Sequence, residues 1–131
     1  DGTIDVIATD HAPHTIDEKE VEFAQAPFGI VGLETALGLC ITELVEPGYL
    51  TLMQLAEKLS TNPRRVLGQK PVEVTEGVMA NLTMIDPLTE WTVDIQEFHS
   101  KSKNSPFHGR KLRGRAIGVV NNGSCLFVSA D

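Results

Sequence analysis

Residues 4–14 read IDVIATDHAPH, a short apolar run that leads directly into one carboxylate and two imidazoles. The run over residues 4–9 is typical of a buried β-strand. Such a strand would deliver Asp10, His11 and His14 to one tip. In enzymes built on a barrel of parallel strands, the catalytic groups lie at the carboxyl ends of the strands. Carboxylate and imidazole are also the ligands and proton carriers of hydrolytic metal sites.

The three side chains of this motif allow different interpretations. Asp10 is either a turn residue or helix cap, or a metal ligand and general base, and three ligand-type residues within five positions favour the second. His11 should point away from Asp10, because adjacent residues of an extended segment face opposite ways, so we interpret it as structural or as a support for a ligand. His14 is either a pocket residue that donates to an anionic substrate or a surface histidine.

The composition restricts the class of protein. The 131 residues suit one domain, and 41% of them are hydrophobic, a normal share for a globular chain. The net charge of −7 argues against nucleic acid or an anionic membrane as the main partner. The two cysteines, Cys40 and Cys125, form no framework spacing. We expect Cys40 to be a buried free thiol, and a reducing cytoplasm fits best.

The beginning of the chain suggests that more sequence precedes it. It has no Met, and Asp1-Gly2-Thr3 leads into a buried-type strand within three residues. A strand that is apolar on both faces needs covering layers and neighbouring strands, and the chain offers few candidates for them. We therefore expect this chain to be the C-terminal piece of a longer protein.

The first half of the chain predicts a loop followed by helices. Residues 15–26 are polar and acidic without a clean period, and we expect a loop there. Phe28-Gly29 follows, where glycine lets the backbone approach a ligand closely and amides near a helix start favour anions. Helical spacing of apolar residues predicts helices over 33–44 and 52–59, and Thr51 begins the second with a capping box. A short helical turn capped by Asn62-Pro63 is expected over residues 64–67.

From Gly68 onward, short strands replace helices. Four strands are predicted, over residues 82–85, 91–93, 116–120 and 125–128. The last two flank Asn121-Asn122-Gly123, a strong signal for a tight hairpin. Residues 97–115 are expected to form a long polar loop.

The predicted polar loop carries histidines and a basic cluster. We expect His99 and His108 to be solvated. The basic cluster consists of Lys101, Lys103, Arg110, Lys111, Arg113 and Arg115. In an acidic chain such a cluster indicates a solvated loop or a subunit contact rather than a nucleic-acid surface. The sequence has no Gly-rich phosphate loop, no Cys-x-x-Cys pair and no Gly-x-Ser-x-Gly elbow.

Two stretches carry a family resemblance, DGTIDVIATDHAPH over residues 1–14 and APFGIVGLET over residues 26–35. They closely resemble the bacterial type I dihydroorotases, amidohydrolase-superfamily enzymes of pyrimidine biosynthesis. Residues 71–87 resemble the strand pattern after the barrel of that family. Residues 105–114, SPFHGRKLRG, resemble a loop near its C-terminus. The resemblance spans nearly the whole chain, but only about the last third of a full enzyme.

The resemblance implies an α/β fold, the C-terminal part of a metal-dependent (β/α)8 barrel followed by strands of a small β-sandwich domain. Residues 1–67 would hold the last barrel strand and its helices. Residues 68–131 would hold the C-terminal share of the β-sandwich. The remaining zinc ligands of the family, among them a His-x-His pair of the first strand, would lie upstream of this chain.

The family reaction is the reversible cyclisation of N-carbamoyl-L-aspartate to L-dihydroorotate, with zinc. By the resemblance, Asp10 is the catalytic base and a ligand of one zinc. It takes a proton from the metal-bound water or hydroxide and protonates the departing nitrogen. His14 matches the residue that holds the substrate carboxylate, and Phe28 and Gly29 match the pair that contacts the substrate through the backbone. His11 matches no assigned contact.

Two other functions stay open. One is another cyclic amidohydrolase of the allantoinase or hydantoinase type, although the residues after Asp10 fit dihydroorotase better. The other is a non-catalytic dihydroorotase homologue that acts as a structural partner, against which the intact Asp10 and His14 count. We expect a cytoplasmic enzyme of a small-molecule substrate, a homodimer or a complex with another pyrimidine-pathway enzyme. The chain alone should bind zinc weakly and be inactive, since a catalytic zinc needs about three protein ligands.

Overall fold

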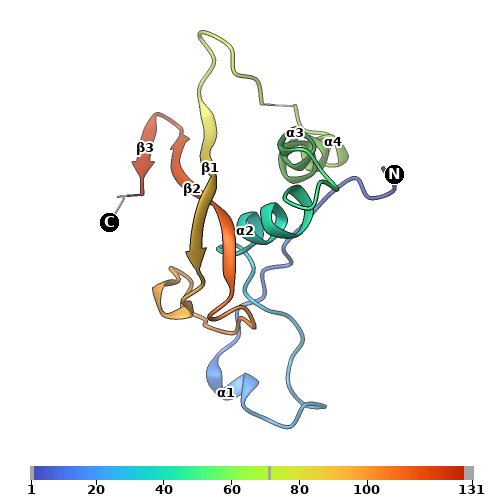
Figure 1. The fold of residues 1–131 in the computed structure, drawn as a ribbon, viewed down its shortest axis with the longest axis vertical. Helices are drawn as coiled ribbons and strands as arrows, with labels where there is room; N and C mark the ends of the chain where they lie inside the picture. Colours follow the sequence, from blue (N-terminus) through green and yellow to red (C-terminus); the bar gives the residue numbers. More distant parts are fainter. Residues whose placement is uncertain (1, 71, 129–131) are drawn as a thin grey trace.

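The computed structural model describes residues 2–70 and 72–128. The α-helices are α1 (Ile16–Lys19), α2 (Ala36–Cys40), α3 (Leu52–Ala56) and α4 (Asn62–Val66). The other helical segments are η1 (Ile41–Val45) and η2 (Glu57–Thr61), both π-helical, and the 3-10 turn η3 (Ile95–Glu97). The strands are β1 (Asn81–Thr92), β2 (Lys111–Asn121) and β3 (Ser124–Phe127). Figure 1 shows the strands rising along the long axis, with α2, α3 and α4 on one side of them.

The sheet is antiparallel in the order β1-β2-β3. The hairpin predicted between β2 and β3 is confirmed: Asn121 pairs with Ser124, and Asn122 and Gly123 form the two-residue loop. Their φ angles of 48° and 79° are the positive pair that such a turn requires. The right-handed twist of the flanking strands favours this turn, so the local sequence specifies the register here.

Two predicted strands, over residues 82–85 and 91–93, form the single strand β1. Its pairing with β2 is interrupted between Asp86 and Glu90. There the Asp86 carboxylate accepts hydrogen bonds from the Leu88 N–H at 2.8 Å and the Thr89 hydroxyl at 2.6 Å. Pro87 has no N–H to give to a ladder, so it lies in the irregular part. The interruption predicted between the two strands is therefore present, but both parts belong to one strand that pairs with β2 on either side of it.

The predicted loop over residues 97–115 is too long, because β2 begins at Lys111. Leu112 and Gly114 are buried, whereas Lys111 and Arg115 are exposed. This alternation is that of a strand with one solvated face. In the sequence, the many charged residues of the exposed face made this alternation look like a polar loop.

The helix predicted over residues 33–44 forms over residues 36–45, and the helix predicted over residues 52–59 continues to Val66. α2 continues into η1, and α3 continues through η2 into α4. The capping box at Thr51 is confirmed, since its Oγ1 accepts from the Gln54 N–H at 3.2 Å. The predicted cap at Asn62 is wrong: with φ −68° and ψ −44° it is helical, and its N–H donates to the Glu57 carbonyl across a wider π-helical turn.

The expected loop over residues 15–26 contains the one-turn helix α1. Thr15 accepts from the Glu18 N–H at 3.3 Å, and the Glu18 carboxylate accepts from the Thr15 N–H at 2.9 Å. This is a second capping box of the kind predicted at Thr51. The Thr-x-x-Glu pattern marks the start of this helix in the sequence, although no helical spacing of apolar residues follows it.

The predicted buried strand over residues 4–9 is not formed by the described residues. Ile4 is 67% exposed, and the Ile7 N–H donates to the carbonyl of Lys58 at 3.1 Å. The Asn62 side chain donates to the Asp5 carbonyl at 2.8 Å, and Lys58 donates to the Ile4 carbonyl. The segment is extended along the α3–α4 helix, because the described chain supplies no strand beside it to complete a ladder.

The core consists of two small clusters. One joins Val31 to Val93, Phe98 and Leu112, and the other consists of Cys40, Ile41 and Leu55. The first cluster brings together residues on both sides of the boundary predicted after residue 67. Cys40 is a buried free thiol, as expected, and burial raises its pKa.

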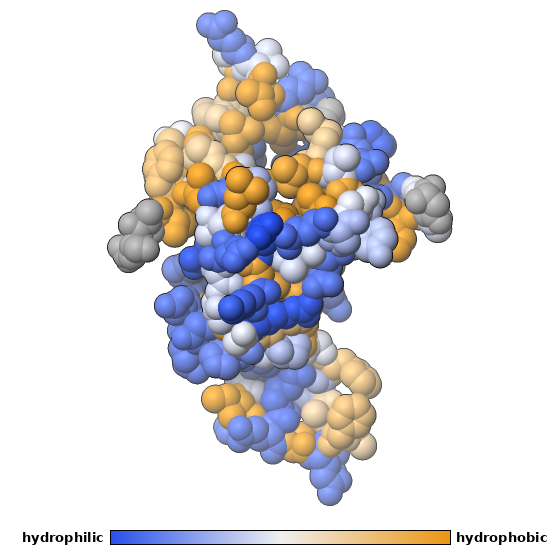
Figure 2. Space-filling model, in the orientation of Figure 1, coloured by the Kyte–Doolittle hydropathy of each residue, from blue (hydrophilic) through white to orange (hydrophobic). Residues whose placement is uncertain are grey.

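Much apolar surface remains uncovered. A groove of about 670 Å³ between the α3–α4 helix and β1 is lined by Leu37, Leu52, Leu55 and Leu82, among others. Figure 2 shows apolar residues in large patches above and below a hydrophilic band. Among the described helices, none combines the length and apolar character of a membrane span.

Candidate functional site

Asp10 lies at the end of the extended N-terminal segment in an unusual backbone conformation. Its φ is +43°, in the left-handed region that few residues other than glycine adopt, Asp and Asn among them. It is exposed, and no hydrogen bond or ion pair joins its carboxylate to another residue in the described part of the chain. Backbone strain of this kind gathers at functional sites. The carboxylate is therefore free to bind a ligand or accept a proton.

His11 is engaged on the opposite side. Its Nδ1 accepts the Gly32 N–H at 3.1 Å and, at a longer 3.4 Å, the Leu33 N–H. A ring nitrogen that accepts carries no proton, so neutral His11 carries its proton on Nε2. His11 thus ties the motif to the residues just before α2, in agreement with its structural interpretation.

His14, Phe28 and Gly29, the predicted substrate-binding residues, lie together. The His14 Nε2 is 2.9 Å from the Phe28 carbonyl oxygen, a hydrogen bond in which the imidazole N–H donates. Its Nδ1 lies 3.6 Å from the Glu18 carboxylate. The hydrogen bond from the Thr15 N–H is the main cause that holds the pKa of Glu18 below its ordinary value. In this conformation the His14 Nε2–H is engaged by the Phe28 carbonyl.

The segment of residues 27–30 presents its carbonyls to the protein. Lys19 donates to the first and third of these carbonyls at 2.7 and 2.8 Å. His14 donates to the second, and the Ala12 N–H donates to the fourth at 2.9 Å. The N–H groups of residues 28–30 donate to no residue in the part of the chain that the structure describes. These free amides can bind the oxygens of a ligand.

Gly29 is required by the approach of this segment to the motif. Its φ is +101°, and a Cβ built there would lie 2.5 Å from the Cβ of Ala12. Any side chain would push the segment away from residues 10–14. Phe28, in contrast, turns its ring to solvent and is 92% exposed. Only the backbone of Phe28 is therefore placed to take part in the site.

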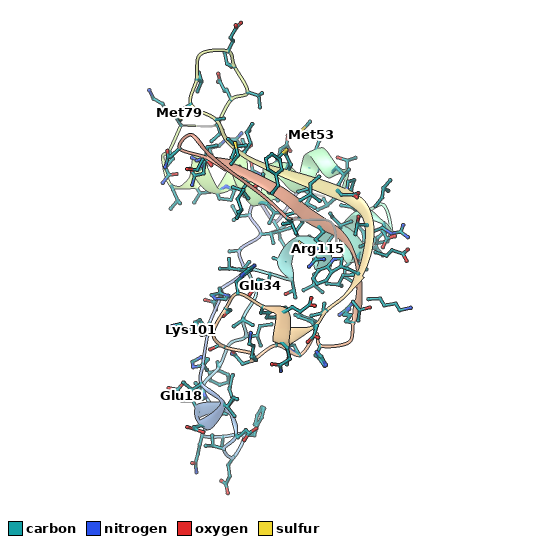
Figure 3. All side chains as sticks on the ribbon, turned by 90° about the vertical axis from the view of Figure 1, so that its left-hand side faces the viewer. Glu18, Glu34, Met53, Met79, Lys101 and Arg115 are labelled. Atoms are coloured by element: carbon teal, nitrogen blue, oxygen red, sulfur yellow. The ribbon has the colours of Figure 1, made fainter. Side chains whose placement is uncertain are left out.

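A third segment, residues 98–107, reaches the motif and was missed by the sequence reasoning. The Asn104 side-chain N–H donates to the Ala12 carbonyl at 2.9 Å, and the Ser102 hydroxyl donates to the His14 carbonyl at 2.7 Å. Figure 3 shows Lys101 of this loop between Glu18 and Glu34. The only available signal was the position of Asn104, directly before the resemblance at residues 105–114.

Two arginines of the basic cluster, Arg110 and Arg113, take no part in this site, whereas Lys101 and Lys103 lie on the loop of residues 98–107. Arg113 forms ion pairs with Glu46 at 2.7 Å and with Glu90, and Arg110 pairs with Glu43. The hydrogen bond from Arg113 is the first cause that lowers the pKa of Glu90. Arg113 therefore joins β2 to β1 and to the residue after η1, and Arg110, directly before β2, pairs with η1, so both arginines form ion pairs within the chain.

A complete zinc centre does not fit the described residues. No group of three or more His, Cys, Asp or Glu side chains that could hold a metal ion occurs within residues 2–70 and 72–128. A catalytic zinc takes about three protein ligands and one open position. Asp10 fits the role of one such ligand and no more.

Comparison with known proteins identifies close sequence relatives. No family model matches the chain. It is 58% identical over 126 residues to a protein named dihydroorotase from Chlorobaculum tepidum, and 54% identical to one from Acetivibrio thermocellus. Each match covers 96% of this chain. The chain spans 29% and 30% of the lengths of these two relatives.

Comparison of structures identifies solved proteins with a matching fold. L-hydantoinase (dihydropyrimidinase) from Arthrobacter aurescens matches the chain with a TM-score of 0.85 at 30% identity. The match covers 96% of this chain and 29% of that protein. The fold expected from the resemblance, part of an amidohydrolase of the (β/α)8 type with strands of a further small sheet, is confirmed.

Proposed function

We propose that this chain, a relative of the dihydroorotases over 96% of its length, is the C-terminal part of an enzyme that interconverts N-carbamoyl-L-aspartate and L-dihydroorotate. One observation carries the proposal. The Asp10 carboxylate is unpaired at φ +43°, four residues before His14, which contacts the Phe28-Gly29 segment. The step belongs to pyrimidine biosynthesis in the cytoplasm.

Asp10 is the general base and acid of the reaction. Its free carboxylate takes a proton from the water that attacks the ring amide, and then gives that proton to the departing nitrogen. In the direction of ring closure, it takes the proton from the carbamoyl nitrogen. Zinc, when bound, would supply Lewis acidity at this place, with Asp10 as one ligand and the others upstream of this chain.

The substrate carboxylate is held by His14 and by the backbone of Phe28 and Gly29. The His14 Nε2–H leaves the Phe28 carbonyl and donates to the carboxylate. The free N–H groups of residues 28–30 supply further donors without any charged group. Because the carbonyls of residues 27–30 are held by Lys19, His14 and Ala12, the free N–H groups of this segment need little ordering on binding, whereas His14 must first give up its bond to Phe28.

The domain assignment follows from the same resemblance. Residues 1–67 belong to the barrel and residues 68–131 to the β-sandwich. The cluster of Val31 with Val93 and Leu112 would then form part of the interface between the two domains. The enzyme acts as a homodimer or in a complex with another pyrimidine-pathway enzyme. The uncovered apolar groove beside β1 is surface that such a partner would cover.

The test compares substrates in the full-length protein that contains this chain. L-dihydroorotate should turn over much faster than hydantoin or dihydrouracil, which have no carboxylate for His14 and the free amides. Faster turnover of hydantoin would indicate a hydantoinase, in line with the structural match to L-hydantoinase. Absence of turnover of all three by the zinc-loaded protein would indicate a non-catalytic homologue.

A further inference from the structure

The loop of residues 98–107 joins two segments of the site that are far apart in the sequence. The Asn104 side-chain N–H group donates to the Ala12 carbonyl at 2.9 Å and lies 3.4 Å from the Gly29 carbonyl. The Asn104 Oδ1 accepts the His14 N–H at a long 3.4 Å. The Asn104 carbonyl accepts the Val31 N–H at 3.2 Å. One residue thus bridges the motif around His14 and the segment around Gly29.

The side chain of Asn104 has the chemistry that this place requires. It faces two carbonyls, which need a donor, and one N–H, which needs an acceptor. A side-chain amide offers two N–H donors and one acceptor oxygen, whereas a hydroxyl has a single donor. An aspartate of the same size would place a charged oxygen against the carbonyls of Ala12 and Gly29.

The loop itself is firmly held. The Glu34 carboxylate accepts the N–H groups of His99 at 2.7 Å and Ser100 at 3.1 Å. Lys103 donates to the Phe98 carbonyl at 2.8 Å, and the Phe98 ring lies in the core. Asn104 is therefore mounted on an anchored loop rather than on a free one, which is what positioning of a neighbouring site demands.

We infer that Asn104 is a positioning residue that sets the spacing between His14 and Gly29 and so determines how tightly the substrate carboxylate is held. This inference rests on the proposed function. Asp10 keeps its support when the Asn104 amide is lost, because His11 still accepts the Gly32 N–H and the Ala12 N–H still donates to the Ile30 carbonyl. Loss of the Asn104 amide therefore weakens substrate binding much more than it slows the proton transfer.

The experiment measures kcat, KM and melting temperature in the full-length enzyme for Asn104→Ala and Asn104→Asp. Both variants should raise KM for L-dihydroorotate about tenfold or more, with kcat changed less than about threefold, because misplacement of substrate contacts is costly. Asp should be no better than Ala. A melting temperature close to that of the wild type excludes general unfolding as the cause.

Ser105→Ala is the matched control. Ser105 neighbours Asn104, and among the described residues its hydroxyl accepts from the Phe107 N–H alone. This variant should keep both kcat and KM. An Asn104→Asp enzyme with the KM of the wild type would overturn the inference, as would a loss of kcat in proportion to lost folded protein with KM unchanged.

A second measurement separates failure of this inference from failure of the proposed function. If the wild-type protein does not turn over dihydroorotate, hydrogen exchange of the Ala12 and His14 amides still tests the positioning. These amides should exchange faster in Asn104→Ala than in Ser105→Ala, since the two segments lose their bridge. Equal exchange in the two variants would overturn the inference.

Discussion

At the scale of single residues, Asp10 combines backbone strain with a free carboxylate. The strain of a left-handed non-glycine residue is of the order of 1 kcal/mol or more, and it must be offset by the structure around it. Ala12, His11 and His14 supply this through their bonds to residues 28–33. The neighbours of Asp10 thus fix its position and leave its side chain available.

Asp10→Asn tests this assignment. Asn has the same shape and tolerates positive φ equally well, and within residues 2–70 and 72–128 no hydrogen bond to the carboxylate would be broken by the change. We expect kcat of the full-length enzyme to fall about 10²- to 10⁴-fold, the usual contribution of a general acid–base group, with an unchanged melting temperature. Asp17→Asn, an exposed change in the first turn of α1, is the control. Activity within tenfold of the wild type would contradict the role of Asp10.

Asp86 makes a pH-dependent contribution to stability. Hydrogen bonds, first from the Thr89 hydroxyl and then from the Leu88 N–H, hold its pKa below the ordinary 3.8. A carboxylate with a depressed folded pKa stabilises the fold above its unfolded pKa, and this contribution is lost as the pH falls through the folded pKa. Asp86→Asn should therefore reduce the loss of stability below about pH 4.

The measurement for Asp86 is the urea midpoint of unfolding at pH 6 and pH 3. The difference between the two midpoints should be smaller in Asp86→Asn than in the wild type. Asp5→Asn is the control, because no hydrogen bond to the Asp5 side chain occurs in the described chain. An identical pH dependence of variant and wild type would show that the turn does not bind the charged form more tightly.

At the scale of elements, η1 packs closely on β2 because β2 has a glycine, Gly114, at the point of contact. Gly114 on β2 has a φ of +89°, and a Cβ there would lie 2.2 Å from the Cδ1 of Ile41 on η1. Trp91 of β1 also contacts Gly114, because its indole N–H donates to the Gly114 carbonyl at 3.0 Å. A side chain at this position would separate η1 from the sheet.

Gly114→Ala should therefore destabilise the fold by about 3 kcal/mol, the sum of overpacking and left-handed strain. Gly109→Ala is the control, since its φ of +77° carries the same strain but no atom lies within 4 Å of the Cβ that alanine would add. Urea unfolding followed by the fluorescence of Trp91, the single tryptophan, gives both values. Equal losses in the two variants would refute the close packing of Gly114 on Ile41.

Elements were predictable wherever the signal was local. The capping box at Thr51 and the Asn-Gly turn at residues 122–123 act through neighbouring backbone groups, so the sequence specifies them directly. The strand over residues 4–9 depends on partners elsewhere, and the described chain does not supply them. The start of β2 was missed because exposed charges alternate with its buried residues.

At the scale of the whole molecule, one ligand cannot make a zinc site. The isolated 131-residue chain should retain far less than one zinc per chain after dialysis, as measured by elemental analysis. Asp10→Asn should leave this small amount nearly unchanged. Tightly held zinc near one per chain would contradict the assignment of the other ligands to upstream sequence.

The sequence by itself determined the motif around Asp10, the caps and turns, and through its resemblance the family of enzymes. These depend on residue identity and on contacts between near neighbours, which a linear pattern contains. Only the tertiary structure decided that His14 binds the Phe28 carbonyl, that residues 28–30 keep free amides, and that Asn104 bridges the two segments. Asn104 lies 92 residues from Ala12, and the anchoring of its loop by Glu34 and Phe98 brings the two together.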